Sequence, residues 1–245
     1  MKNSLNKSQI ERFSRQLVLK NIGPKGQKKI LSSKILIVGV GGLGCPAAEN
    51  LVRAGIGTIG LIDNDIVNLS NIHRQSLFSS KDVKKTKVSV AAKKLKEINP
   101  LTKIKTYKSR LNEKNIENII KNYELIIDGS DNFKTKFLIN DYCMKLKKKL
   151  ITGAISKFDG HIFTFDFKDK KTASLKNFYQ EEKISDDILN CEFEGVLGTT
   201  ASVVGTIQAN EALKMIMEIG QGLKNQILII DLLNLNFRKV KYKKR

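Results

Sequence analysis

Polar and charged side chains suited to binding a polyphosphate occur in three short segments of this 245-residue chain. Together the segments supply a carboxylate, a guanidinium, an ammonium group and an amide. Such a set can neutralise the charge that develops on a leaving pyrophosphate, whereas a hydride transfer needs no such cluster. A carboxylate can also hold Mg²⁺ together with phosphate oxygens. The segments are Ser70-Asn71-Ile72-His73-Arg74-Gln75, Lys87 and Asp128-Gly129-Ser130-Asp131-Asn132.

A glycine-rich turn between two apolar runs accompanies these side chains. The run 35–38 predicts a buried strand, and the glycines after it predict a turn that opens a helix. Glycine lets backbone N–H groups approach a phosphate, and a helix N-terminus adds partial positive charge. The next apolar run, 59–62, ends at Asp63 and Asp65, where an acid can contact a ribose hydroxyl. The turn glycines are Gly39, Gly41, Gly42 and Gly44.

Strands that alternate with helices must position these groups. The alternation predicts an α/β fold: a Rossmann-like, mostly parallel, doubly wound sheet with antiparallel C-terminal strands, in a single domain over residues 1–245. Ser8 and Glu11 fit a capping box that begins a first helix carrying Ile10, Phe13, Leu17 and Val18. The expected strands are 34–38, 58–63, 102–107, 125–128, 149–153, 161–167, 227–231 and 235–242. Later helices are expected up to residue 32 and at 44–54, 86–98, 112–122, 132–146 and 198–219, with a mobile loop at 168–194.

Taken alone, the charge balance suggests nucleic acid or another acidic partner. The alternative is that most of these lysines are simply solvated surface residues, which their spread along the chain favours. Lysine and arginine number 44 against 24 acidic residues, which gives a formal net charge of +20. An acidic protein would be attracted to such a surface. The lysines are spread along the whole chain and form no basic stripe interleaved with aromatic residues, so nucleic acid is left open as a partner but is not favoured.

Cysteine usage and the N-terminal sequence limit the class of protein. Cys45, Cys143 and Cys191 form no CxxC pair, which predicts neither a disulfide framework nor a cysteine zinc site. Cys45 and Cys143 are expected to pack inside the fold. The N-terminus has no apolar block of the kind found in secretory signals, and no apolar run is long enough to cross a membrane. We therefore expect a cytoplasmic protein with no membrane partner.

Five segments, in order and with similar spacing, give the chain a family resemblance. It resembles the HesA/MoeB/ThiF family, adenylyltransferases that activate sulfur-carrier proteins for molybdopterin and thiamine synthesis and are related to ubiquitin-activating enzymes. The matching segments are RFSRQLVL (12–19), ILIVGVGGLGCPAAENLVRAGIGTIGLIDNDIVNLSNIHRQ (35–75), KTKV (85–88), DGSDNFKTKFLIND (128–141) and GVLGTTASVVGTIQANEALK (195–214).

The resemblance implies a mechanism and a set of site residues. ATP would bind on the glycine turn, with Gly42 against the phosphates and Asp63 on the ribose. The C-terminal glycine carboxylate of a small ubiquitin-like carrier ending in Gly-Gly would attack the α-phosphorus, giving a carrier acyl-adenylate and pyrophosphate. The residue matching Arg15 reaches the phosphates of the neighbouring subunit in this family, which implies a homodimer. Asn71, Arg74 and Lys87 would hold the triphosphate, Asp131 would bind Mg²⁺, and Asn132 would lie beside the nucleotide.

The chain departs from the family pattern in three places. The two CxxC pairs that hold zinc in many members are absent, so no zinc is predicted. No rhodanese-like domain follows, so a sulfur donor would act in trans. Cys191 stands where relatives carry a cysteine that takes part in sulfur or acyl transfer. Its acidic neighbours would raise the thiol pKa, so a reactive role and no role are left equally open. These neighbours are Asp186, Asp187, Glu192 and Glu194.

Other functions stay open on the sequence alone. Related enzymes adenylate a modified adenosine in tRNA, as the threonylcarbamoyladenosine dehydratases do, and the +20 charge suits that substrate. A nicotinamide-dependent oxidoreductase would use the glycine turn and Asp63 but leaves Arg74, Lys87 and residues 128–132 unexplained. A scaffold without turnover would not need the phosphate-binding cluster. The sequence leaves the carrier, the pathway and any sulfur-transfer step undetermined.

Overall fold

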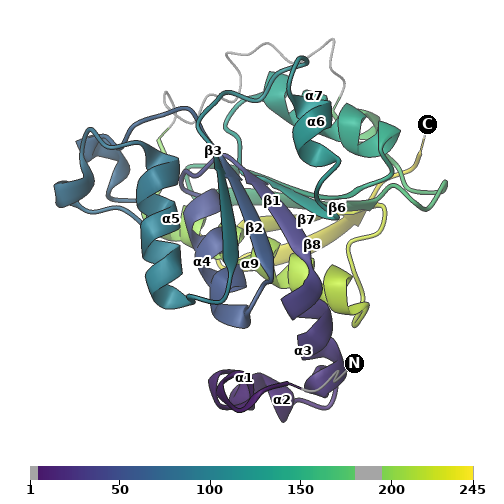
Figure 1. Ribbon diagram of the computed structural model, residues 1–245. Helices are drawn as coiled ribbons and strands as arrows, with labels where there is room; N and C mark the ends of the chain where they lie inside the picture. Colours follow the sequence, from purple (N-terminus) through teal and green to yellow (C-terminus); the bar gives the residue numbers. More distant parts are fainter. Residues whose placement is uncertain (1–4, 180–194, 245) are drawn as a thin grey trace.

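A computed structural model describes residues 5–179 and 195–244 of the chain (Figure 1). In this part of the chain, eight strands form one sheet in the order β3-β2-β1-β4-β5-β6-β7-β8. β3, β2, β1, β4 and β5 are parallel, and β6, β7 and β8 continue the sheet as antiparallel neighbours. The strands are β1 (Lys34–Val38), β2 (Thr58–Ile62), β3 (Lys103–Tyr107), β4 (Leu125–Asp128), β5 (Lys149–Ser156), β6 (Asp159–Asp166), β7 (Gln226–Asp231) and β8 (Asn236–Lys241).

Helices cover both faces of the sheet, which confirms the predicted doubly wound α/β architecture. The helices are α1 (Lys7–Arg12), α2 (Ser14–Leu17), α3 (Gly23–Ser32), α4 (Gly44–Ala54), α5 (Lys87–Ile98), α6 (Ile116–Ile120), α7 (Phe133–Lys145) and α9 (Gly198–Met217). Short 3₁₀ turns lie at η1 (Leu69–Asn71), η2 (Ser80–Asp82) and η3 (Leu175–Asn177).

Alternate side chains of β1 belong to two different cores. Ile35 and Ile37 pack with α3, α4, α5 and α9 on one face, whereas Leu36 and Val38 pack with α6 and α7 on the other. All four are at most 4% exposed. A strand that is apolar at every position is the expected sequence of a parallel strand buried on both sides. The carboxyl ends of β1, β2 and β4 therefore meet at one edge between two helical layers, where open α/β sheets bind ligands.

The N-terminal helix differs from the prediction. The capping box is formed by Asn6 and Gln9 instead of Ser8 and Glu11, and the helix is interrupted at Phe13. Phe13 is 1% exposed, but Ile10 and Val18 are 49% and 76% exposed. Figure 1 shows α1 and α2 at one end of the molecule, away from β1 to β4. Burial of Phe13 thus anchors this segment, while Ile10 and Val18 face outward and Leu17 is half-buried.

Two helices are shorter than predicted, and the central hairpin is longer. Asn112 does not cap a helix, because its side chain accepts a hydrogen bond from the amide of Lys114 in a turn, and α6 begins only at Ile116. The last long helix ends at Met217, since Glu218 adopts the left-handed conformation. Pairing between β5 and β6 continues from Lys149↔Asp166 to Ser156↔Asp159, beyond the predicted ends of both strands.

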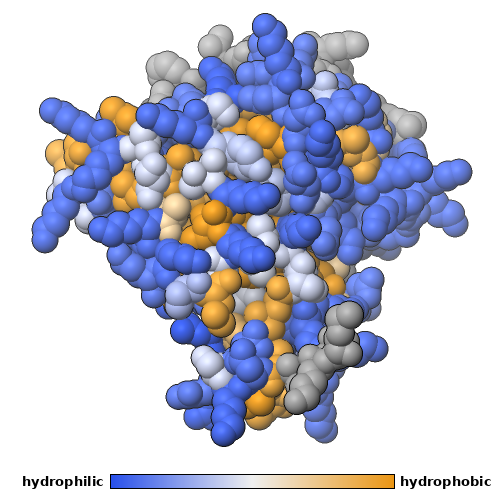
Figure 2. Space-filling model, in the orientation of Figure 1, coloured by the Kyte–Doolittle hydropathy of each residue, from blue (hydrophilic) through white to orange (hydrophobic). Residues whose placement is uncertain are grey.

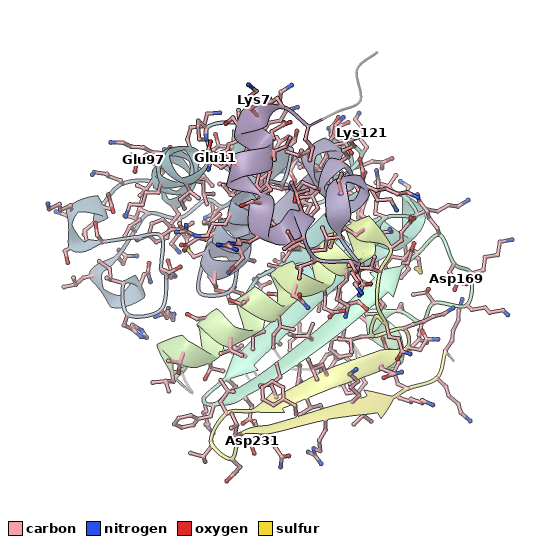
Figure 3. All side chains as sticks on the ribbon, turned by 90° about the horizontal axis from the view of Figure 1, so that it is seen from below. Lys7, Glu11, Glu97, Lys121, Asp169 and Asp231 are labelled. Atoms are coloured by element: carbon pink, nitrogen blue, oxygen red, sulfur yellow. The ribbon has the colours of Figure 1, made fainter. Side chains whose placement is uncertain are left out.

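Charged side chains are distributed over much of the surface. Blue, hydrophilic residues cover most of the face in Figure 2, and Figure 3 shows charged side chains projecting from elements throughout the fold, from Lys7 to Asp231. Within residues 5–179 and 195–244, no helix is long and apolar enough to cross a membrane.

Candidate functional site

A cavity of about 480 Å³ lies where the carboxyl ends of β1, β2 and β4 meet. Its lining combines the glycine turn before α4, the acids after β2, the loop after β4 and residues from the β5–β6 hairpin. Residues of all three polar segments therefore line one cavity, although the segments are separate in the sequence. The predicted site residues that line it are Gly39, Gly41, Gly42, Asp63, Asp65, Asn71, Arg74, Gln75, Lys87, Asp131 and Asn132.

Four predicted site residues are not part of this lining. Gly44 is buried as the first residue of α4 beneath the turn. Ser70 is exposed, and its carbonyl oxygen accepts a hydrogen bond of 2.8 Å from Arg74 Nη1. Arg15 is exposed on α2, at the end of the molecule away from the cavity. Cys191 lies outside the described residues.

Asp63 ties the end of β2 to the glycine turn. Its Oδ2 accepts a hydrogen bond of 2.7 Å from the backbone N–H of Val40, and its Oδ1 accepts one of 2.8 Å from the backbone N–H of Asp65. These bonds fix the carboxylate at the wall of the cavity, next to the turn. A carboxylate in this place can accept hydrogen bonds from ribose hydroxyl groups.

Two cations reach the cavity from separate elements. Lys87, the first residue of α5, is 6% exposed, and its Nζ lies 3.0 Å from Asp65 Oδ2. Arg74 donates from Nη1 to the Ser70 carbonyl, and the same atom lies 2.7 Å from His73 Nε2. An arginine and a lysine held beside backbone N–H groups of a turn can bind phosphate oxygens through charge-assisted hydrogen bonds.

The loop after β4 brings a carboxylate to the same cavity. Asn132 caps α7, because its side chain accepts a 2.9 Å hydrogen bond from the backbone N–H of Thr135. Asp131 precedes the cap, is exposed, and accepts a 3.0 Å hydrogen bond from Asn132 Nδ2. No group of three His, Cys, Asp or Glu side chains suited to a metal ion occurs among the described residues. A single exposed carboxylate such as Asp131 is the kind of ligand with which Mg²⁺ binds when its other ligands are phosphate oxygens and water.

Several lining residues were missed by the sequence analysis. Ser109, Arg110 and Leu111 follow β3 and line the cavity. Their position after a parallel strand was a usable signal, because the carboxyl ends of parallel strands share an edge. His161 and Tyr179 also line the cavity, and His161 Nδ1 lies 3.0 Å from the Tyr179 hydroxyl. Desolvation lowers the His161 pKa. No local pattern marked this pair.

The two described cysteines pack inside the fold, as predicted. Cys45 and Cys143 are both 0% exposed. Burial raises the Cys45 pKa to about 12 and also raises the pKa of Cys143. Neither thiol is therefore ionised near pH 7, and neither has the reactivity of a thiolate.

Comparison with known proteins identifies a family and several relatives that resemble this chain over most of its length. The model of the ThiF family matches residues 13–245. A relative from Thermus thermophilus described as "Sulfur carrier protein adenylyltransferase" is 37% identical over 96% of this chain and 88% of its own length. A relative from Gracilaria tenuistipitata var. liui described as "Probable molybdopterin-synthase adenylyltransferase" is 38% identical over 97% of this chain. The chain covers 66% of that relative and 53% of a Drosophila virilis protein described as "Adenylyltransferase and sulfurtransferase MOCS3".

Solved structures share the fold. The crystal structure of Escherichia coli MccB with MccA-N7isoASN superimposes with a TM-score of 0.85 at 20% identity, over 98% of this chain and 74% of that one. A structure of the same protein with ATP gives a TM-score of 0.83 at 22% identity, over 96% of this chain and 72% of that one. At this identity the likeness is one of fold, and it agrees with the mixed, mostly parallel sheet described above.

Proposed function

Because this chain belongs to the ThiF family, we propose that it adenylylates the C-terminal glycine carboxylate of a small ubiquitin-like sulfur-carrier protein. ATP is the AMP donor and pyrophosphate is released. The relatives named as sulfur-carrier and molybdopterin-synthase adenylyltransferases support this proposal, since they match almost the whole chain at 37% and 38% identity. Residues 1–245 act as one adenylyltransferase domain.

The observation that carries the proposal is the single cavity shared by the glycine turn, two cations and an exposed carboxylate. Transfer of AMP to a carboxylate needs charge neutralisation on the leaving pyrophosphate. It needs no general base, because a terminal carboxyl group is already ionised near pH 7. Catalysis is then a matter of positioning and electrostatic stabilisation, which rigid backbone donors, Arg74 and Lys87 can supply.

Most of the predicted site residues have a direct or supporting role in this scheme. Gly41 and Gly42 offer backbone N–H groups to the phosphates, whereas the N–H of Gly39 donates to the Ile62 carbonyl at 2.9 Å and Gly39 only lines the cavity. Asp63 accepts from the ribose. Asp131 would hold Mg²⁺, which supplies Lewis-acid stabilisation of phosphate oxygens when bound. The remaining residues complete the phosphate and nucleotide contacts: Ser70 orients Arg74, Asp65 orients Lys87, and Asn71, Gln75 and Asn132 add amide groups.

The proposal is tested by ATP–pyrophosphate exchange in the presence of Mg²⁺. We expect exchange that depends on a carrier protein ending in Gly-Gly, with separate reactions for carriers of the molybdopterin and thiamine pathways. Stimulation by one carrier and not by a variant lacking its terminal glycine would also identify the pathway. Absence of exchange with every such carrier, despite measurable ATP binding, would contradict the proposed acceptor.

A second candidate is adenylation of a tRNA base, favoured by the net charge of +20. Phosphate contacts by lysine and arginine make nucleic-acid affinity fall steeply with salt. Filter binding of unfractionated tRNA between low and physiological salt therefore distinguishes the two acceptors. Weak binding that does not respond to salt would leave the protein carrier as the acceptor.

A homodimer would bring Arg15 to a second active site. The segment that carries Arg15 lies away from the cavity of its own chain and exposes Ile10, Val18 and Leu19. Apolar side chains are visible around this end of the molecule in Figure 2. An exposed apolar surface of this kind suits contact with a second copy of the chain.

A homodimer in which Arg15 reaches the partner's site predicts complementation between two inactive variants. Arg15→Ala and Asp131→Ala are each expected to lose exchange activity. After subunit mixing, about a quarter of wild-type activity should return, because half of the dimers are mixed and each contains one intact site. Lys7→Ala, on the exposed surface of the same N-terminal segment (Figure 3), is the matched control and should keep full activity alone. Failure to recover activity in verified mixed dimers would place Arg15 outside the partner's site.

A further inference from the structure

Asp128, at the end of β4, is a buried centre of hydrogen bonding directly below the cavity. Its side chain is 0% exposed. Its Oδ1 accepts hydrogen bonds from the backbone N–H of Ser130 at 2.9 Å and from Ser130 Oγ at 2.5 Å. Its Oδ2 accepts from Thr152 Oγ1 at 2.5 Å and its backbone carbonyl from Gln208 Nε2 at 2.9 Å. One carboxylate therefore links β4 to the loop after it and to β5, while its main chain is joined to α9.

Lys136 supplies the cation for this carboxylate. Its Nζ lies 3.2 Å from Asp128 Oδ2 and donates a 2.6 Å hydrogen bond to the carbonyl oxygen of Gly153. The two side chains are 5% and 0% exposed, so the charge of each is compensated mainly by the other and by these hydrogen bonds. A buried pair of this kind does little for net stability, but removal of one partner leaves an uncompensated charge.

The loop between Asp128 and α7 is held at both ends by these bonds. Ser130 is fixed to the Asp128 carboxylate, and Asn132 is fixed to the first turn of α7 through the backbone N–H of Thr135. Asp131 lies between these two anchors and faces the cavity. The hydrogen bonds of Ser130 and Asn132 therefore hold the chain on either side of Asp131. Lys136 adds to this by binding the Asp128 carboxylate, to which Ser130 is attached.

We infer that Lys136 is a positioning residue: through Asp128 it holds residues 129–132 in the conformation that presents Asp131 to the metal-bound polyphosphate. The inference rests on the proposed function for the identity of that ligand. Groups that orient a metal-binding residue characteristically change metal affinity about 10–100-fold when they are replaced. Lys136 also lines the cavity, so a change confined to this position acts next to the site.

The test uses three single variants on one helix. Lys136→Met removes the cation, Lys136→Arg keeps donors for Asp128 and Gly153, and Lys134→Met removes an exposed lysine two residues away as the control. ATP binding is measured by calorimetry at increasing Mg²⁺ concentration and again in EDTA. Hydrogen–deuterium exchange of the peptide spanning residues 129–132 is measured without nucleotide.

The expected result separates positioning from general destabilisation. Lys136→Met should need about 10–100 times more Mg²⁺ for half-maximal enhancement of ATP binding. Its ATP affinity in EDTA should stay unchanged, and exchange at residues 129–132 should accelerate. Lys136→Arg and Lys134→Met should resemble the wild type. Unchanged exchange and Mg²⁺ dependence in a folded Lys136→Met protein would overturn the inference, as would equal effects in Lys134→Met or loss of function in Lys136→Arg.

Two further variants decide the matter if Lys136→Met does not fold. The double variant Asp128→Asn/Lys136→Met removes both buried charges, and Ser130→Ala detaches only the loop hydroxyl. Both should accelerate exchange at residues 129–132 and raise the Mg²⁺ requirement, Ser130→Ala to a smaller extent. If both behave like the wild type, the inference is wrong. Wild-type protein that binds no ATP under any condition would instead contradict the proposed function.

Discussion

Replacement of Asp131 with alanine should abolish ATP–pyrophosphate exchange and leave the fold intact. Asp131 is exposed, and its only described hydrogen bond joins it to the neighbouring Asn132 side chain at 3.0 Å. Its carboxylate therefore contributes little to packing but is the acid of the loop after β4 that faces the cavity. Loss of the carboxylate that we propose as the Mg²⁺ ligand should slow exchange by about 10³-fold or more, equivalent to about 4 kcal/mol of transition-state stabilisation.

The control for this experiment removes an acid at a distance from the cavity. Glu97 is exposed on α5 and labelled in Figure 3, and Glu97→Ala should keep wild-type exchange activity. Circular dichroism and thermal unfolding of Asp131→Ala should match the wild type. An exchange rate close to that of wild type in Asp131→Ala would remove Asp131 from the metal site, whereas a lowered melting temperature would assign it a structural role.

Two glycines of the same turn should fail in opposite ways when a side chain is added. At Gly41 the nearest atom to an added Cβ, beyond its chain neighbours, is Gln75 Nε2 at 3.7 Å, and the position lines the cavity. At Gly44 the added Cβ would lie 1.9 Å from the carbonyl oxygen of Gly39. A side chain at Gly41 would occupy the space that we propose for a phosphate, and one at Gly44 would collide with the backbone that forms the turn.

Gly41→Val should therefore fold but lose ATP binding. We expect its free energy of unfolding to stay within about 1 kcal/mol of wild type. Its ATP affinity should fall about 100-fold, equivalent to about 2.7 kcal/mol of lost charge-assisted hydrogen bonds. Gly44→Ala should lose at least about 3 kcal/mol of stability, because neither the turn nor α4 can move aside without losing contacts. Chemical denaturation and calorimetric ATP titration measure both effects; equal loss of stability in the two variants would contradict this division.

Local sequence was sufficient to predict those strands, turns and helices whose defining residues lie within a few positions of one another. The apolar run of β1 and the glycines after it predicted a strand, a turn and a helix at their observed positions. Asp63 could be assigned because it ends the next buried strand, and the structure ties it to the turn through the N–H of Val40. Strand direction and the shared edge of the sheet follow from alternating strands and helices, which limit the possible topologies.

Predictions failed where several local patterns compete for the same residues. Ser8 with Glu11 and Asn6 with Gln9 both have the spacing of a capping box, and only the second forms. Burial of Phe13 fixes the direction of the chain in this segment and leaves Ile10 exposed. A capping preference contributes about 1 kcal/mol, so the burial of an aromatic side chain outweighs it.

The sequence by itself determined the nucleotide-type turn, the acids that follow β2 and β4, and the order in which strands and helices alternate. It determined these because each depends on residues close together in the chain. Only the tertiary structure decided that Lys136 reaches Asp128 and Gly153, and that His161 and Tyr179 share the cavity with the glycine turn. The sequence around Lys136 does not indicate that its side chain is buried and paired, because the pairing depends on how α7 packs against β4 and β5. Long-range contacts of this kind join the chemical groups of local motifs to the fold that holds them in place.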